Sequence, residues 1–460
     1  MLIGFTKKHW VAILVTLAFF AFIINALLFY PGYMSNDTLA MFYASRGVVP
    51  TNIAPVLLGL VWRILYQLTG KTSSILLFQL SMLWSALCLF SIYTFKKTGN
   101  RTLSLLCLVI GVLPFVINIS GVIWRDGQMT FALVLAFAIF LFAKDMGNKK
   151  WRRVLFIAIL ILSLYAALSR YNAIIAVVPM VFLFAHFSGF FNKIRWQIAV
   201  TILFMLLTAV SFPLVNLAIG ARSIDNSPGL LLDDIIRVSK EDDIKNITMP
   251  TDLRNLLESI RGCSFKENVF VSNIFVCVKP GDDAGVLYRN SGEFKRIWSQ
   301  VIFNNPIGYV TYKLEMFSSI LIPQTDNAYI WQPGIEPNSY GVHVRFQRLG
   351  DINQKYIQKF GYRYLRATFE PWFWLILGLS IFYLSTKRRT KHAYIIRVLI
   401  LSGVLYILGY IPTGATTDYR YIYWSVFAVI FAVILYVLDR YNDRKLTIAT
   451  PTNTRRSKKG

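Results

Sequence analysis

The stretch "NIAPVLLGLVWRILYQLT", residues 52–69, decides the topology of this chain. It is long and apolar enough to suggest a membrane-spanning helix, yet it carries Arg63 near its middle. A charge at the centre of a bilayer is costly, whereas a charge at the interface is tolerated. We therefore predict that residues 52–69 lie along the outer leaflet, or dip into it, without crossing.

The composition around this stretch is that of an integral membrane protein. The 460 residues are 55% hydrophobic and have a mean hydropathy of +0.52, which soluble chains rarely reach. The formal charge of +25 could indicate nucleic-acid binding, but the basic residues lie in short clusters between apolar runs, where topology signals occur. A helix needs roughly 20 residues to cross a bilayer. Ten apolar runs qualify, some of them short, at residues 10–29, 73–94, 102–119, 129–143, 154–168, 173–187, 196–217, 372–385, 394–410 and 421–438.

The basic clusters decide between ten and eleven spans. Cytoplasmic loops collect Lys and Arg. Ten spans put every cluster on the cytoplasmic side, whereas a crossing at residues 52–69 would put every cluster after Lys7 and Lys8 on the opposite side. We predict an all-α polytopic membrane protein with about ten transmembrane helices, outer-leaflet juxtamembrane helices, a large outer loop domain and both termini in the cytoplasm.

Four regions follow from this topology. They are an N-terminal transmembrane region (1–217) with a first outer loop (30–72), a large outer loop domain (218–366), C-terminal transmembrane helices (367–440) and a basic cytoplasmic tail (441–460). The large loop can fold as a small domain and has the pattern of short helices. Its Cys263 and Cys277 could form a disulfide in an oxidising compartment, and elsewhere would stay thiols.

The first outer loop holds Asp37, in "YPGYMSNDTLAMFYASRG", residues 30–47. Asp37 could be the N-cap of a helix that starts at Thr38. Ser35 or Asn36 could cap that helix as easily, so the position does not need a carboxylate for this purpose. The other interpretation is a general base at the membrane surface, with a pKa raised by partial desolvation.

Further charged residues lie in the short outer turns. "GVIWRDGQ", residues 121–128, contains Arg125 and Asp126, which could be an interfacial ion pair, or an anion-binding arginine beside an acid that orients a substrate hydroxyl or supports Asp37. Arg170 in "LSRYN" and Arg420 in "TTDYRYIYW" could snorkel to the interface. Arginine also binds phosphate oxygens in bidentate pairs.

We therefore predict a site for a lipid-linked phosphate on the outer face. Its predicted members are Asp37 and Asp126 as catalytic acids, Arg125, Arg170, Arg420 and Lys313 as phosphate ligands, and Asp418 and Tyr419 as substrate-binding residues. The four histidines form no pair that suggests a metal site, and no phosphate-binding loop for nucleotides is present. We expect no cofactor; a divalent metal is possible but not favoured.

The order of "PGYMSNDT", "GVIWRDG", a large outer loop and "TTDYRYIYW" resembles the integral-membrane glycosyltransferases of the GT-C class. Within that class the chain looks most like bacterial serotype-converting O-antigen glucosyltransferases. The resemblance implies transfer of a sugar, glucosyl in that family, from a polyprenyl-phosphate carrier to surface polysaccharide such as lipopolysaccharide, or to a lipid-linked glycan. It implies an inverting reaction at the periplasmic face of the bacterial inner membrane, with Asp37 as base. Related proteins often have a histidine and paired prolines after this acid, whereas "TNIAPV" has Pro55 and no histidine.

Three other functions fit the sequence less well than sugar transfer. A flippase for lipid-linked sugars would carry charges inside its spans, and the apolar runs contain almost none. An O-antigen polymerase would join lipid-linked oligosaccharides, and the early Asp37 loop favours transfer of single sugars. A non-enzymatic scaffold leaves the acids and arginines of one face unexplained. The expected partners are therefore the lipid-linked donor, a glycan acceptor and membrane lipid, without nucleic acid.

Overall fold

The computed structural model of the chain describes residues 2–449, except 267–271, 280, 324–328 and 415. The described residues are mostly helical and form no β-sheet, only four isolated bridges. The predicted all-α class is therefore confirmed.

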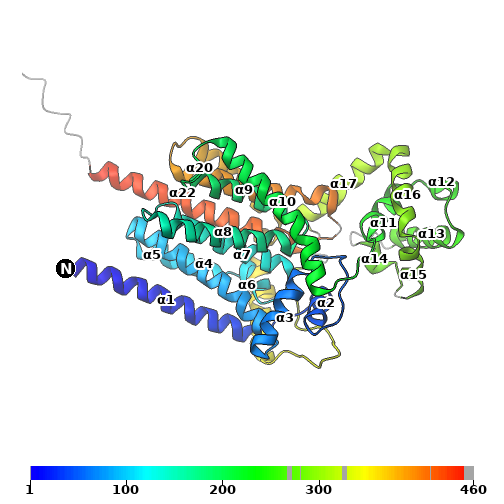
Figure 1. Cartoon of the computed structure of the whole chain (residues 1–460), viewed down its shortest axis with the longest axis horizontal. Helices are drawn as coiled ribbons and strands as arrows, with labels where there is room; N and C mark the ends of the chain where they lie inside the picture. The colour runs from blue at the N-terminus through cyan, green and yellow to red at the C-terminus, as the bar shows by residue number, and fades with distance from the viewer. Residues whose placement is uncertain (1, 267–271, 280, 324–328, 415, 450–460) are drawn as a thin grey trace, which may run out of the picture.

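A helical bundle makes up the larger part of the molecule (Figure 1). Its helices are α1 (Leu2–Leu28), α4 (Ser74–Thr98), α5 (Arg101–Val109), η1 (Ile110–Val112), α6 (Pro114–Ser120), α7 (Arg125–Ala143), α8 (Lys149–Ser169), α9 (Ala173–Phe187), α10 (Ile194–Ile219), α19 (Pro371–Thr386), α20 (Lys391–Leu408), α21 (Tyr410–Thr413) and α22 (Tyr423–Ala449). Seven described helices are long and apolar enough to cross a membrane, or eight if the bent pair α5 and α6 forms one span. This count is lower than the predicted ten.

Two helices and one bend account for the lower count. Helices α9 and α19 have 15 and 16 residues. At 1.5 Å per residue they reach about 23 Å, less than the roughly 30 Å of a hydrocarbon core. The pair α5 and α6 bends by 49°. Pro114 opens α6, and Leu113 before it is extended, as a residue before proline prefers.

Burial separates the centre of the bundle from its edge. In the most apolar window of each helix, 83% of the residues of α7 are buried, against 22% for α1 and 17% for α10. Phe19 and Phe20 on α1 are each 59% exposed, and Leu203 on α10 is 65% exposed. Large apolar side chains on this scale need a lipid environment. The protein is therefore a multi-pass membrane protein with α7 at its core.

The stretch that decided the topology forms a short helix. Helix α3 (Leu57–Thr69) follows α2 (Asn36–Ser45) and has 13 residues, or about 20 Å. It is too short to cross a bilayer, which agrees with the prediction, made from charge, that it does not cross. Leu58 and Trp62 are buried against the bundle, whereas Ile64 and Leu68 are exposed. That it lies along the outer leaflet stays a prediction.

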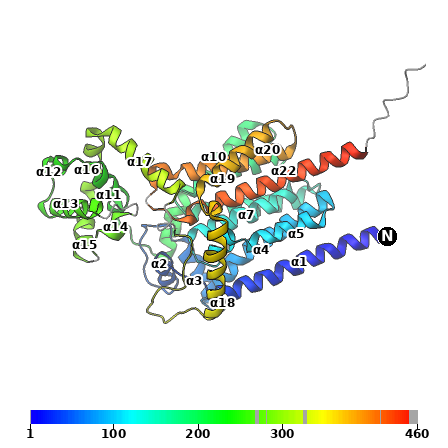
Figure 2. The same ribbon diagram turned by 180° about the vertical axis from the view of Figure 1, so that it is seen from behind.

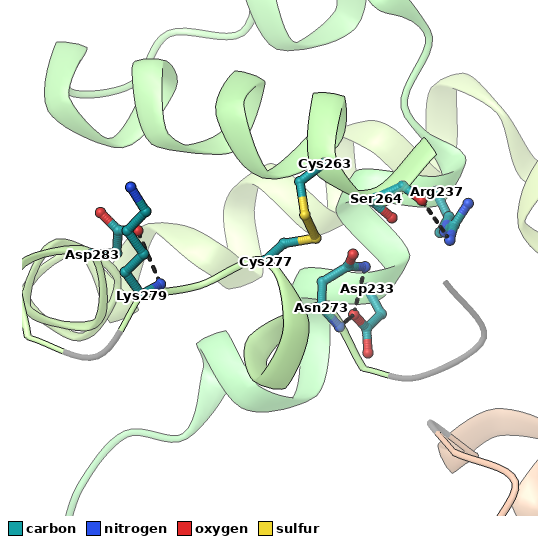
Figure 3. The surroundings of a disulfide bond; sticks show 8 residues. All are labelled: Asp233, Arg237, Cys263, Ser264, Asn273, Cys277, Lys279 and Asp283. Atoms are coloured by element: carbon teal, nitrogen blue, oxygen red, sulfur yellow. Dashed lines mark hydrogen bonds between the residues drawn. A yellow bond between two sulfur atoms is a disulfide. The ribbon is translucent and has the colours of Figure 1, made fainter. Parts of the chain in front are cut away.

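The large loop forms a cluster of short helices with its own hydrophobic core. The helices are α11 (Ser227–Val238), α12 (Glu241–Asn246), α13 (Thr251–Lys266), α14 (Asn273–Val276), α15 (Asp282–Arg289), α16 (Ser291–Asn304) and α17 (Pro306–Leu321). Figure 3 shows Cys263 and Cys277 joined by a disulfide between the end of α13 and the residue after α14. The chain returns to the bundle through α18 (Gln347–Lys355), η2 (Tyr356–Tyr362) and η3 (Arg366–Phe369).

The two ends of the described chain lie at the same end of the bundle, and the helices α11 to α16 lie beyond the opposite end (Figures 1 and 2). This arrangement agrees with termini on one side of a membrane and the large loop on the other. Helix α22 runs on to Ala449, past the predicted end of the helical region at residue 440. The sequence between these positions contains neither Gly nor Pro to stop it. Residues 450–460 of the predicted tail lie outside the described residues.

Candidate active site

Three chain segments meet at the end of the bundle that faces the large loop. The Tyr33 amide donates to the Gly121 carbonyl (3.1 Å), and the Ile123 amide donates to the Tyr33 carbonyl (2.9 Å). Met34 pairs through its amide and its carbonyl with residues 334–336, at 3.0 and 2.9 Å. The first outer loop is thus held between the turn after α6 and a segment of the large loop.

The Pro-Gly turn before Tyr33 makes this pairing possible. Gly32 has a φ of +120°, a backbone conformation that L side chains rarely adopt. A Cβ at this position would also lie 2.9 Å from the Ile123 side chain. Glycine is therefore needed both for the turn and for the close approach to Ile123.

Asp37 does not cap helix α2. The helix begins at Asn36, two residues before the predicted start at Thr38, and its N-cap is Ser35. The Ser35 hydroxyl accepts a hydrogen bond from the Trp124 indole (2.8 Å). The capping interpretation of Asp37 is therefore wrong. Asp37 lies in the first turn, and its Oδ2 is 2.9 Å from Nη1 of Arg420. Its side chain is 42% exposed.

Arg420 comes from the turn before the last helix. Asp418 caps the short 3₁₀-helix η4 (Tyr419–Ile422) by accepting from the Arg420 amide, and its Oδ2 is 2.7 Å from Nε of Arg420. Side chains three residues apart eclipse in a 3₁₀-helix. Asp418 and Tyr421 accordingly share one face, whereas Tyr419 lies on another face and is buried.

These residues line an open cavity of about 560 Å³ that has polar groups on its walls. Its walls are formed by Ser35, Asn36, Asp37, Trp124, Tyr329, Glu336, Thr416, Thr417, Asp418, Arg420 and Tyr421. The Arg420 guanidinium lies over the Trp124 ring, 4.7 Å from its centroid. The cavity thus combines carboxylates, a guanidinium, hydroxyls and aromatic faces, which are the groups that bind sugars and phosphates.

Behind this wall lies a second ion pair. Asp126 is buried and pairs with Nη1 of Arg170. The Arg170 side chain also contacts Asn172 through Nε (3.2 Å) and the Tyr421 ring (5.2 Å). Nη1 of Arg125 is buried and has no hydrogen-bond partner among the described residues. Asp126 therefore serves Arg170, whereas Arg125 has an unpartnered donor but does not line the cavity.

Two of the three cavity carboxylates, Asp37 and Asp418, differ in acidity. Burial acts to raise the pKa of the Asp37 carboxyl, but the Arg420 guanidinium and two further arginines outweigh it and hold the pKa below its ordinary value. We expected desolvation to raise this pKa, so that expectation is wrong. For Asp418, burial outweighs the attraction of Arg420 and raises the pKa to about 6. Asp37 is thus ionised at neutral pH, whereas the pKa of Asp418 lies close to neutral pH.

Five predicted site residues do not line the cavity: Arg125, Asp126 and Arg170 lie behind its wall, and Tyr419 and Lys313 lie elsewhere. Tyr419 is 4% exposed, and its hydroxyl donates to the Phe115 carbonyl (2.6 Å) inside the bundle. Lys313 on α17 is buried and pairs with Asp234 of α11, with Nζ 2.5 Å from Oδ1. Neither side chain lines the cavity. The geometry favours a packing role for Tyr419 and a structural ion pair for Lys313.

Two residues of the large loop line the cavity without having been predicted. They are Tyr329 and Glu336. Tyr329 is placed by backbone pairing with residues 417–419, and the Glu336 amide donates to Met34. The only sequence signal was a carboxylate inside the Pro- and Gly-rich loop "WQPGIEPN", residues 331–338, which by itself indicates no more than a loop.

Comparison with known proteins gives faint similarities only. No family model matches the sequence, and no curated protein matches it. The archaeal oligosaccharyltransferase AglB from Archaeoglobus fulgidus, in complex with an inhibitory peptide and a dolichol-phosphate, is similar at 14% identity and a TM-score of 0.39, over 98% of this chain and 53% of that one. The Archaeoglobus fulgidus oligosaccharyltransferase in complex with zinc and sulfate is similar at 12% identity and a TM-score of 0.38, over 94% and 51%. The chain spans about half the length of these structures.

Proposed function

We propose that this protein is a GT-C-class glycosyltransferase of the bacterial inner membrane, active at its periplasmic face. It transfers a sugar, glucosyl in our assignment, from a polyprenyl-phosphate carrier to a surface polysaccharide or a lipid-linked glycan. One observation carries the proposal: a partly exposed carboxylate, Asp37, shares an open cavity with Arg420 at the end of a membrane bundle. The cavity lies at the end opposite the described termini, where a lipid-linked donor and an outer acceptor can meet.

The proposed reaction uses Asp37 as base. The ionised Asp37 carboxylate takes the proton of the acceptor hydroxyl, and the hydroxyl oxygen attacks the anomeric carbon of the donor sugar. The bond from that carbon to the carrier phosphate breaks, with inversion, and the phosphate leaves with the electron pair. Arg420 stabilises its charge directly, and Arg125, behind the cavity wall, adds to the positive potential.

The reaction is proposed to need no metal, because arginines offset the phosphate charge. Transfer that is unchanged in EDTA would agree with this proposal, and transfer that is abolished by EDTA and restored by Mg²⁺ or Mn²⁺ would contradict it.

The Cys263–Cys277 disulfide supports an oxidising compartment for the large loop.

The test is a transfer assay on the purified full chain with polyprenyl-phosphate-glucose and crude surface glycolipid. We expect Asp37→Asn to lose about 10²- to 10⁴-fold in rate, the usual contribution of a general base. Asp282→Asn is the matched control, since Asp282 is exposed in the large loop and does not line the cavity. Its transfer rate should equal that of the wild type.

The other outcomes discriminate among the alternatives. Full transfer by Asp37→Asn would reject Asp37 as the base and turn attention to Glu336 and Asp418. No transfer by the wild type would reject this donor and acceptor. Lipid-linked oligosaccharide would then be supplied to test a polymerase, and translocation of labelled lipid-linked sugar would test a flippase.

A further inference from the structure

A second cavity, of about 500 Å³, lies at the other end of helix α2. It is lined by Ser45, Arg46, Gly47, Arg63, Tyr66, Gln67 and Tyr340. Asp37 is in the first turn of α2, and Arg46 follows its last residue. Nine residues of helix separate them by about 14 Å. The two cavities share no lining residue, so the second one is a separate site.

This second cavity contains two arginines and no carboxylate. The Arg46 guanidinium lies 3.4 Å from the centroid of the Tyr66 ring and donates from Nη2 to the Thr72 hydroxyl (2.5 Å). Arg63 donates from Nε and Nη2 to the Ala44 carbonyl, at 3.2 and 2.6 Å. Both side chains are thereby held in place, so little further ordering is needed when a ligand binds.

Among the described residues, neither arginine has an anionic partner, although the Arg46 guanidinium lies over aromatic rings. Within the described part of the chain, neither Arg46 nor Arg63 forms an ion pair, whereas Arg420 and Arg170 at the active site both do. Nε of Arg46 is also buried without a hydrogen-bond partner. A buried donor without an acceptor is costly, so Arg46 keeps unsatisfied hydrogen-bonding capacity beside the cavity.

Exposed apolar side chains flank the same cavity. Val48 and Val49, directly after Gly47, are 51% and 48% exposed. On α3, Ile64 and Leu68 are 48% and 78% exposed, and they lie next to Arg63 and Gln67 in the sequence. Cationic groups beside exposed aliphatic groups match the head-group level of a membrane.

We propose that the cavity lined by Arg46 and Arg63 binds the phosphate of a membrane lipid. The guanidinium groups hold the phosphate oxygens, and the lipid chains lie along the exposed faces of Ile64 and Leu68. The phosphate can come from an anionic phospholipid or from a lipid-linked glycan. The site does not depend on the proposed transfer reaction, because its evidence and its test concern binding alone.

The test measures binding to the purified full chain in neutral detergent. The probes are dioctanoyl phosphatidylglycerol and farnesyl diphosphate, with dioctanoylglycerol as the probe without phosphate. All variants carry Arg420→Gln, which weakens binding of the probes in the active-site cavity. Loss of charge-assisted hydrogen bonds in Arg46→Gln/Arg63→Gln should raise Kd about tenfold or more. Lys71→Gln, an exposed cation of the same region outside the cavity, should leave Kd unchanged.

A second variant guards against misfolding. Gln67 lines the cavity and is exposed, so Gln67→Glu places a negative charge there that competes with phosphate, while both arginine side chains are retained. It should also weaken phosphate binding. A rise in Kd for phosphatidylglycerol alone identifies a phospholipid site, and a rise for farnesyl diphosphate alone identifies a lipid-linked substrate. Unchanged Kd values for both probes in both variants would overturn the proposal.

Discussion

Two carboxylate–cation pairs outside the spans use the same chemistry in opposite ways. At the cavity, Asp37 pairs with Arg420 at 2.9 Å and is 42% exposed. In the large loop, Asp234 pairs with Lys313 at 2.5 Å, and their side chains are 5% and 10% exposed. A ligand can reach the first pair, whereas packing encloses the second.

The surrounding charges differ as well. Around Asp37, Arg420 and two further arginines overcome burial and lower the pKa of its carboxyl. Around Asp234, burial outweighs Lys313 and the Trp298 indole and raises the pKa of its carboxyl. A single cation does not recover the cost of burying a carboxylate, as is common for buried pairs. The difference teaches that an excess of arginines around an accessible acid marks a binding site, whereas a one-to-one buried pair marks packing.

The largest effect on stability is expected from breaking the enclosed pair. Lys313→Met leaves Asp234 buried without its cation, which typically costs about 3–5 kcal/mol. We expect a clear fall in the thermal midpoint of unfolding, with the donor KM unchanged for the protein that remains folded. The double variant Asp234→Asn/Lys313→Met should regain most of the midpoint, because no unpaired charge is left.

One outcome of the Lys313→Met experiment would contradict the contrast drawn between the two ion pairs. A Lys313→Met variant with wild-type stability and a raised donor KM would return Lys313 to the phosphate site, as the sequence had suggested. Arg296→Met is the matched control, since Arg296 pairs with Glu293 at the exposed surface of the same loop. Exposed pairs contribute at most about 1 kcal/mol, so its midpoint should barely move.

A smaller effect is expected from the disulfide. Cys263 and Cys277 are 14 positions apart, and closing a loop of about 15 residues contributes about 3 kcal/mol in the chain-entropy account. Cys263→Ser/Cys277→Ser should lower the temperature at which the large loop unfolds. Limited proteolysis at increasing temperature measures this change. Transfer activity at low temperature should be retained, since neither cysteine lines the cavity. Loss of activity in a protein that still resists proteolysis would contradict this separation of roles.

Sequence reasoning located the part of the site that lies next to spans. Asp37 and Arg420 each lie within a few residues of a long apolar run, so topology alone put them on one face, and the structure joins them. Tyr419 was grouped with its neighbours because adjacency was the only guide. The 3₁₀ turn that buries it depends on the Asp418 cap, which no local pattern predicted.

Sequence reasoning could not predict which residues of the large loop reach the cavity. Glu336 and Tyr329 reach the cavity through backbone pairing with Met34 and with residues 417–419, which are distant in sequence. Lys313 was predicted as a phosphate ligand because the sequence does not reveal its partner Asp234. Bundle helices were predictable because long apolar runs have a single solution in a membrane. Loop contacts were not, because they depend on tertiary pairing.

The smallest effect is a shift of the pH profile, and it separates Asp37 from Asp418, two of the three cavity carboxylates. A base must be ionised, so transfer should fall as pH drops through its pKa. With Asp37 as base, kcat/KM should hold down to below pH 4, since the Asp37 pKa lies under its ordinary value. With Asp418 as base, the rate should already fall near pH 6. In Arg420→Gln the main lowering influence on Asp37 is lost, so its pKa rises and the acid limb moves to higher pH. An acid limb near pH 6 in the wild type that disappears in Asp418→Asn would instead assign the base to Asp418, and the accessible pair would then serve to hold the phosphate.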